Sequence, residues 1–148
     1  MHAFAAAGSA FLVAVLWFDL MFDVQVRGHG EEALPPQVLS SIATYYRRVT
    51  TEAAPMSGLI SLVMLATLAA IVAELVLGDR PAWRAILSLV LALFAIGLAG
   101  ARIVRNAKTL GAGEGAPEAR SSLARGIYRD HLWCLAAMAS VTGLQLLV

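Results

Sequence analysis

The chain has 148 residues, a formal net charge of +1 and a mean hydropathy of +0.75. Hydrophobic residues make up 59% and charged residues 14%, whereas soluble domains average about 45–50% apolar and about 25% charged residues. These figures exclude an ordinary soluble domain and a disordered chain, and the single cysteine, Cys134, excludes a disulfide scaffold. The small net charge gives no reason to expect a nucleic-acid partner. We therefore expect an integral membrane protein that is surrounded by a lipid bilayer.

Four segments are apolar enough to cross a bilayer as helices, which takes about 20 residues each. They cover residues 3–26, 56–77, 82–110 and 121–148, and nothing between residues 1 and 148 indicates a separate soluble domain. Helices are expected rather than strands, because an open sheet leaves backbone groups unpaired in lipid. The sequence predicts an all-α integral membrane protein, a four-transmembrane-helix bundle that forms a single transmembrane domain.

The connection between the first two spans contains an amphipathic pattern. A helix over residues 36–51 would carry its apolar residues on one face: Val38, Leu39, Ile42, Tyr46 and Val49. Such a helix can lie in the headgroup plane with its apolar face toward the lipid tails. We predict a short interfacial amphipathic helix here. The alternative is that the segment continues into the second span through a kink near Pro55.

Lysine and arginine are distributed unevenly between the two sides of the predicted bundle. Nine of them lie in or beside the connections between spans one and two and between spans three and four, and only Arg80 and Arg84 lie on the other side. Positive loops stay in the cytoplasm, so both termini are expected on the periplasmic or exterior side. The ten-to-one excess of arginine over lysine is typical of a GC-rich bacterial genome. We therefore predict a multi-pass protein of the bacterial cytoplasmic (inner) membrane.

Small residues recur at helical spacing on two of the predicted spans. The first span carries Ala3, Ala7, Ala10 and Ala14, and the third carries Ser88, Ala92, Ala95 and Ala99. Small residues let membrane helices approach one another closely. The two stripes predict a tight bundle, and the alternative is that a stripe forms an oligomer interface. Because four short spans enclose little volume of their own, we also expect a homo-oligomer.

Ionisable side chains gather at the predicted cytoplasmic ends of all four spans. Asp19, Asp23 and Arg27 follow one another at intervals of four residues, an order that favours an ion pair between Asp23 and Arg27. Asp19 lies deepest, and because a carboxylate at that depth needs a partner, Arg102 or His131 is expected to pair with it. The candidate ligand- or proton-binding residues are Asp19, Asp23, Glu52, Arg102, Arg105, Asn106, Tyr128, Asp130 and His131. The alternative is simple anchoring of the helix ends, in which the arginines reach the headgroups.

One face of the last span carries an imidazole, a thiol and a thioether at helical spacing. His131, Cys134 and Met138 are the ligand types that suit copper or haem iron. Methionine and cysteine are also ordinary packing residues, and no familiar metal motif accompanies them. We therefore predict no metal site and keep these three residues as weak candidates. The cofactor and the catalytic residues stay open.

Three functions fit this pattern. In the first, the charged residues bind or conduct a small ion, a proton or an anionic, lipid-like ligand. In the second, the protein is a membrane-embedded oxidoreductase that acts on a lipophilic substrate with a metal, haem or quinone. In the third, it is an accessory subunit of a larger membrane complex. The first is favoured because four helices bring opposite charges to one depth, which topology alone does not require. The sequence does not decide whether the protein is an enzyme.

Overall fold

The computed structural model describes residues 1–30, 32–78 and 81–147. Every regular element in these ranges is helical, as predicted. The α-helices are α1 (His2–Asp23), α2 (Pro36–Arg47), α3 (Ala54–Leu77), α4 (Ala82–Leu98), α5 (Val104–Ala112) and α6 (Pro117–Leu146). A 3₁₀ turn, Val24–Val26, extends α1. Two π-helical turns, Arg48–Glu52 and Ala99–Ile103, follow α2 and join α4 to α5.

Three helical stretches are long and apolar enough to cross a membrane: His2–Val26, Pro55–Leu77 and Ala82–Ala112. They coincide with the first three predicted spans, which agrees with a multi-pass helical membrane protein. The fourth predicted span falls on α6, which is not apolar enough along its length to be one of these stretches. Its last residue, Val148, lies outside the described residues, and so does Arg80 of the predicted exterior loop.

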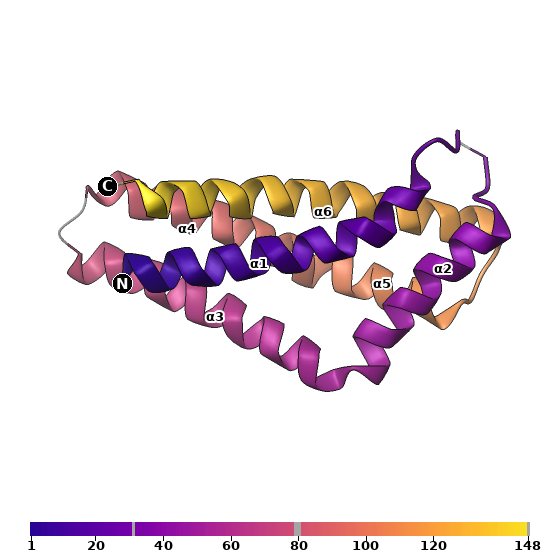
Figure 1. The fold of residues 1–148 in the computed structure, drawn as a ribbon, viewed down its shortest axis with the longest axis horizontal. Helices are drawn as coiled ribbons and strands as arrows, with labels where there is room; N and C mark the ends of the chain where they lie inside the picture. Colours follow the sequence, from indigo (N-terminus) through magenta and orange to yellow (C-terminus); the bar gives the residue numbers. More distant parts are fainter. Residues whose placement is uncertain (31, 79–80, 148) are drawn as a thin grey trace.

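α6 packs against both α1 and α4, and α1 also packs against α3 (Figure 1). The two chain termini lie at the same end of the molecule, and α2 lies at the opposite end. Small residues make the helix contacts close. Ala5 and Ser9 of α1 and Ala92 of α4 are buried. Gly8 leaves no room for a Cβ atom next to the side chain of Thr67 on α3.

The predicted small-residue stripe faces the bundle interior in the third span but not in the first. Ser88, Ala92 and Ala95 are buried, and Ala99 is half-buried. Ala3, Ala7, Ala10 and Ala14 are all exposed. α1 instead turns Ser9 and Leu12 inward. Leu12 fills the core, and the Ser9 hydroxyl accepts a hydrogen bond from Thr142 of α6 at 2.9 Å. The inner face of α1 is also built mainly of small residues, Ala5, Ala6 and Ser9, whereas Phe4 and Phe11 point outward.

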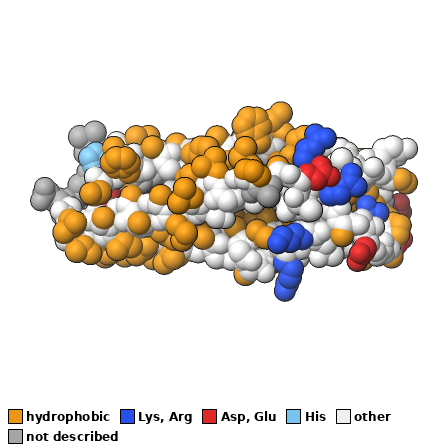
Figure 2. Space-filling model, turned by 90° about the horizontal axis from the view of Figure 1, so that it is seen from below, with side chains coloured by type: hydrophobic (Ala, Val, Ile, Leu, Met, Phe, Trp, Pro, Cys, Tyr) orange, Lys and Arg blue, Asp and Glu red, His pale blue; other side chains and the backbone are white. Residues whose placement is uncertain are grey.

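Charged side chains gather toward one end of the molecule. On the face drawn in Figure 2, Lys, Arg, Asp and Glu side chains cluster there, and hydrophobic side chains cover most of the rest. Large apolar residues such as Phe4, Leu62, Leu65 and Val76 are more than half exposed. An apolar surface of this extent is unusual for a soluble monomer and is typical of a surface that meets lipid.

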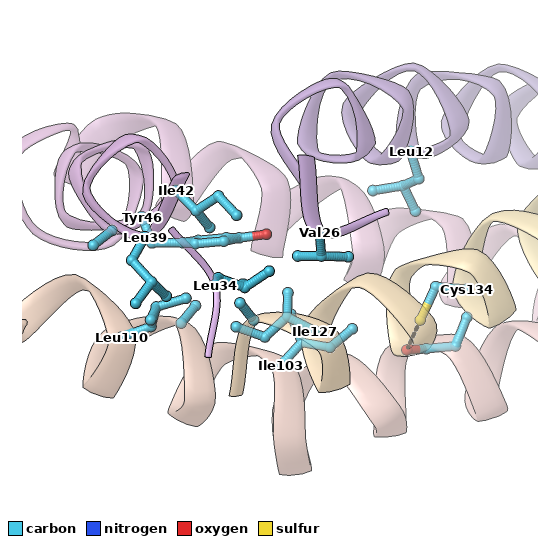
Figure 3. Close-up of a cluster of buried hydrophobic side chains, with 14 of the residues drawn as sticks. Leu12, Val26, Leu34, Leu39, Ile42, Tyr46, Ile103, Leu110, Ile127 and Cys134 are labelled. Carbon is cyan, nitrogen blue, oxygen red and sulfur yellow. Dashed lines mark hydrogen bonds between the residues drawn. The ribbon is translucent and has the colours of Figure 1, made fainter. Parts of the chain in front are cut away.

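α2 packs across the charged end through its apolar face. Leu39 and Ile42 are buried in one core with Leu110 of α5 (Figure 3). Gly111 permits this approach, because a Cβ atom there would lie 2.8 Å from the backbone nitrogen of Arg47. The apolar face of α2 is thus covered by the protein itself, and the same helix reaches over the ends of α1 and α6.

α2 does not continue into α3 as a straight helix. Ala53, with φ −99° and ψ 48°, interrupts the helix after the π-helical turn. Pro55 lies in the first turn of α3, where its missing N–H costs nothing. In Figure 1, α2 and α3 meet here in a V. A helix is therefore present over Pro36–Arg47, and the chain bends near Pro55, where the alternative placed a kink.

Candidate functional site

His131 of α6 lies between two aspartates of α1. Its Nδ1 is 2.6 Å from Oδ2 of Asp23, and its Nε2 is 3.8 Å from Oδ2 of Asp19. Asp19 and Asp23 are about one turn apart on α1, and α1 packs along α6, so both carboxylates reach the same ring. The side chains of His131 and Asp23 are buried, and that of Asp19 is 18% exposed. We call these three residues the Asp–His–Asp cluster.

Two consecutive tyrosines of α2 complete the site. The Tyr46 hydroxyl donates to Oδ1 of Asp23 at 2.6 Å, and the Tyr45 hydroxyl donates to Oδ1 of Asp19 at 2.5 Å. Each carboxylate therefore accepts from a tyrosine with one oxygen and faces the histidine with the other. Phe22 stacks on Tyr45, with ring centroids 4.0 Å apart and an interplanar angle of 10°. These contacts fix the orientation of both carboxylates.

Burial raises the pKa of both phenols well above its usual value near 10. For Tyr46, burial is the largest cause, and the negative charge of Asp23 raises the pKa further. For Tyr45, burial is again the largest cause, followed by the charge of Asp19. Both hydroxyls therefore keep their protons at physiological pH and act as donors. Their role is to hold the carboxylates in place.

Asp130, the neighbour of His131 on α6, makes a different contact. Nε of Arg102, in the π-helical turn between α4 and α5, is 3.3 Å from Oδ2 of Asp130. Asp130 is buried, whereas 46% of the Arg102 side chain is exposed. Arg129 is 4.0 Å from the other oxygen. Of the two partners expected for Asp19, the structure therefore supplies the histidine, and Arg102 is used by Asp130.

The remaining candidate residues make no hydrogen bond or ion pair to the Asp–His–Asp cluster within the described structure. Glu52 pairs with Arg47 at 3.3 Å, and both side chains are more than half exposed. Arg105 is exposed on α5, and Asn106 is half-buried there. Tyr128 lines a separate hollow beside the loop that follows α1. These residues share a depth along the bundle, but they face different directions around it.

The ion pair expected between Asp23 and Arg27 does not form. α1 ends at Asp23, and the chain continues as the 3₁₀ turn Val24–Val26. The tighter turn takes Arg27 out of the i, i+4 register, and its side chain is exposed. Asp23 turns inward instead, to Tyr46 and His131.

The three weak metal candidates have different surroundings. His131 faces the two aspartates, Cys134 Sγ lies 3.5 Å from the carbonyl oxygen of Ala95 (Figure 3), and Met138 is buried in the apolar core. In the part of the chain that the structure describes, no group of three or more His, Cys, Asp or Glu is arranged to hold a metal ion. The 2.6 Å between His131 and Asp23 is a hydrogen-bond distance, so an ion does not fit between these atoms.

Sequence reasoning missed Tyr45 and Tyr46 as site residues. The pattern placed Tyr46 on the apolar face of a predicted helix and gave Tyr45 no role. One signal was available, because a buried tyrosine hydroxyl needs a hydrogen-bond partner. Which partner it takes depends on how α2 lies across α1, and local spacing contains no information about that.

No protein-family model matches the chain, and no curated protein and no solved structure is significantly similar to it. The function therefore has to follow from the chemistry of the site. Two carboxylates, one imidazole and two protonated phenols form a set of groups connected by hydrogen-bond and ion-pair contacts.

Proposed function

We propose that this chain is a membrane protein that binds a proton in the Asp–His–Asp cluster and exchanges it with one side of the membrane. The observation that carries the proposal is that both ring nitrogens of His131 face carboxylate oxygens, of Asp23 and Asp19. A neutral imidazole has one N–H and one lone pair, so one nitrogen then faces a carboxylate with no proton between them. A second proton on the ring gives each carboxylate a donor. The cluster therefore gains an attractive contact when it takes up one proton.

The charge of the cluster favours a proton over an anionic ligand. With both carboxylates ionised, the two aspartates outweigh the single imidazole whether the ring is neutral or protonated. The arginine at this depth, Arg102, is already opposite Asp130. An anion would therefore meet net negative charge here, and in a low-dielectric interior that repulsion is large.

The interior of the bundle favours exchange with one side over conduction across it. Beyond the cluster, the next buried polar contacts are Thr142 to Ser9 at 2.9 Å and Gln145 to Ser88 at 3.1 Å. The buried residues of α6 between His131 and Thr142 offer a weak thiol and otherwise apolar side chains. At the helical rise this layer is about 16 Å thick. Protons move along chains of hydrogen-bonded groups, and this layer contains no such chain within the described structure.

We further propose α6 as the fourth span. Its polar residues are turned inward, since Asp130, His131 and Gln145 are buried, while Leu132 and Trp133 are exposed. The inward polar groups lower the mean hydropathy of the helix. Lipid, however, would meet only its apolar outer face. Buried polar groups that face the bundle interior are the usual arrangement in membrane helices.

Exposed tryptophans support a position for the bilayer. Trp17 and Trp133 lie two residues from Asp19 and His131, and Trp83 lies at the start of α4; all three are more than half exposed. Tryptophan is enriched at membrane–water interfaces. The helical rise from Trp83 to the π-helical turn at 99–103 is about 28 Å, close to the roughly 30 Å of the hydrocarbon core. The cluster then lies at the boundary on the charged side, which the positive-inside rule makes cytoplasmic.

We propose that α2 lies in the headgroup layer on that side. Most of its exposed residues are polar, among them Gln37, Ser40, Ser41 and Thr44. Cysteine labelling tests both placements in a Cys134→Ala background. A membrane-impermeant maleimide should modify Ser122→Cys from one side of the membrane and Leu146→Cys from the other, and Ser41→Cys from the Ser122 side. Modification of Ser122→Cys and Leu146→Cys from the same side would contradict the fourth span.

Nitrogen NMR of the histidine rings tests proton binding. In ring-¹⁵N-labelled protein in micelles, the His131 signals should move with pH, reversibly, between a singly and a doubly protonated ring. His131→Gln identifies these signals among the 3 histidines of the chain. Asp19→Asn should change the pH of half-protonation, whereas Glu52→Gln, which removes an exposed carboxylate, should not. His131 signals that stay constant over about pH 5 to 9 contradict the proposal.

A second candidate function is a membrane-embedded oxidoreductase in which the cluster donates or accepts the proton of a lipophilic substrate. The partial exposure of Asp19 between the outward-facing Trp17, Phe18 and Met21 favours it, because a substrate dissolved in the bilayer meets this surface. An absorption spectrum and metal analysis of the purified protein test it. A chromophore that is lost in His131→Ala supports this function. The homo-oligomer and the accessory subunit stay predictions, which co-purification in mild detergent tests.

A further inference from the structure

A basic hollow lies beside the loop that follows α1, apart from the Asp–His–Asp cluster. It has a volume of about 720 Å³, and the loop and the first half of α6 line it. Its charged lining residues are Arg27, Arg125, Arg129 and Glu118, and His29 also lines it. Three guanidinium groups against one carboxylate give the hollow a positive charge. Its sign is opposite to that of the proton site.

Hydrogen bonds to α6 hold the wall of the basic hollow in place. Nη2 of Arg125 donates to the carbonyl oxygens of Gly30 and Glu32, at 2.6 Å each. The backbone N–H of Leu34 donates to Oγ of Ser121 at 2.9 Å. Leu34 itself is buried in the core. The loop is therefore attached to α6 at both of these points, and the hollow exists before any ligand enters it.

Two of the three arginines are available to a ligand. Within the described ranges, the Arg27 side chain makes no hydrogen bond or ion pair, and it is exposed. Arg129 makes one contact, at 4.0 Å, to an Asp130 that Arg102 already approaches more closely. Nδ1 of His29 is enclosed and has no hydrogen-bond partner in the described structure. The hollow thus brings together two arginines with donors to spare and a ring nitrogen that has no partner in the described structure.

The inner part of the hollow lies at the depth of the lipid headgroups. Arg129 and Arg125 precede Trp133 by about one and two turns of α6, which places their backbones about 6 and 12 Å beyond the tryptophan level. The headgroup layer extends about 5–8 Å beyond the hydrocarbon core on each side, so Arg129 lies within it and Arg125 lies just beyond it. This placement rests on the proposed fourth span, whereas the hollow and its charges do not. Basic pockets on the cytoplasmic side of membrane helices suit anionic headgroups.

We propose that the basic hollow binds a phosphate group. Guanidinium groups present planar pairs of N–H donors that match phosphate oxygens and carry the opposite charge. Arg27 contacts the phosphate from the loop and Arg129 from α6, and Arg125 contributes charge while it holds the loop. The position of the hollow makes the headgroup phosphate of an anionic lipid one source, and a soluble phosphate compound is the other.

Binding measurements in detergent test the proposal and separate the two sources. The probes are dioctanoylphosphatidylglycerol and inorganic phosphate. Titration calorimetry measures the affinity of the full chain for each of them. We expect the lipid to bind and the Arg27→Gln/Arg129→Gln double variant to bind it about tenfold more weakly or worse, as the loss of charged hydrogen bonds predicts. Added salt should weaken binding to the native protein. Inorganic phosphate that binds as tightly as the lipid assigns the site to a soluble phosphate compound.

Arg105→Gln is the matched control, because Arg105 is exposed at the same end and does not line the hollow. It should bind the lipid like the native protein. Both arginines in the double variant are exposed, so its circular dichroism should stay native, and each single variant serves as a second test. Unchanged binding in the double variant, an equal loss in Arg105→Gln, or no binding of either probe to the native protein overturns the proposal. None of these outcomes depends on the protonation of His131.

Discussion

His131 and Asp23 are 108 positions apart in the chain, and their side chains lie 2.6 Å apart in its interior. Both are almost completely buried, and Asp23 has no exposed surface at all. A buried carboxylate is stable only when its oxygens have partners, and here one oxygen faces His131 and the other accepts from Tyr46. The contact between α1 and α6 is thus fixed by a polar pair as well as by apolar packing.

Removal of the Tyr46 hydroxyl should destabilise the fold. Tyr46→Phe leaves one oxygen of the buried Asp23 without its donor, and we expect the free energy of unfolding to fall by about 1–3 kcal/mol. Tyr45→Phe should cost less, because Asp19 is partly exposed and water can replace the lost donor. Unfolding of both variants in one detergent measures the difference. A larger loss for Tyr45→Phe than for Tyr46→Phe would contradict the burial argument.

The contact between Arg102 and Asp130 should appear in a double-mutant cycle. Arg102→Gln leaves the buried Asp130 without its closer cation, and because the arginine is about half exposed we expect a loss of about 1–2 kcal/mol. In an Asp130→Asn background the same arginine change should cost less. The coupling energy should be about 0.5–1.5 kcal/mol. Strictly additive losses would show that the pair, although close, contributes nothing to stability.

Gly111 should be intolerant of a side chain. A Cβ atom there would lie 2.8 Å from the backbone nitrogen of Arg47 and 3.0 Å from its Cα, so α2 must move away from α5. Gly111→Ala should lower the free energy of unfolding by about 1–3 kcal/mol. Gly143→Ala is the control, because the space around Gly143 on α6 is open. That change should be neutral or slightly stabilising. Equal melting temperatures for the two variants would refute the close approach.

Tyr45 and Tyr46 should lose their protons only at a higher pH than an exposed tyrosine does. Burial raises the pKa of Tyr45 and Tyr46 in the folded state above the unfolded value near 10. Their contribution to stability is therefore complete below about pH 10 and is lost as the pH rises through the folded values. In an absorbance titration, folded Tyr45→Phe/Tyr46→Phe and folded native protein should give the same tyrosinate signal up to about pH 11. In denaturant, where all hydroxyls are exposed, the protein with its natural sequence should give a larger tyrosinate signal than the double variant. A difference between the folded proteins near pH 10 would argue against burial of the hydroxyls.

Much of the site follows from spacing within single helices. Asp19 and Asp23 share a face because they are four residues apart, and depth alone limited the partners of Asp19 to Arg102 and His131. The choice between those two depends on the rotation of α4 and α6 about their axes. The π-helical turn at 99–103 changes that rotation just where Arg102 lies, and a regular helical pattern does not reveal such a turn.

The errors have one physical origin, which is extrapolation of a regular helix. Arg27 was expected to pair with Asp23, but the chain leaves the α-helix between them. Tyr128 was grouped with His131, three residues away, although their side chains face different surroundings. The amphipathic pattern identified the apolar face of α2, but the pattern did not show that this face packs on α5. Periodicity assigns residues to a face, and only tertiary packing decides what covers that face.

The Asp–His–Asp cluster joins residues that are far apart in the chain. Asp19, Asp23 and the two tyrosines all precede α3, and the imidazole belongs to α6. Until α6 packs against α1, both carboxylates therefore lack the histidine. A fragment that ends before α6 would leave the buried Asp23 without this partner, so the cluster reports whether α1 and α6 have come together.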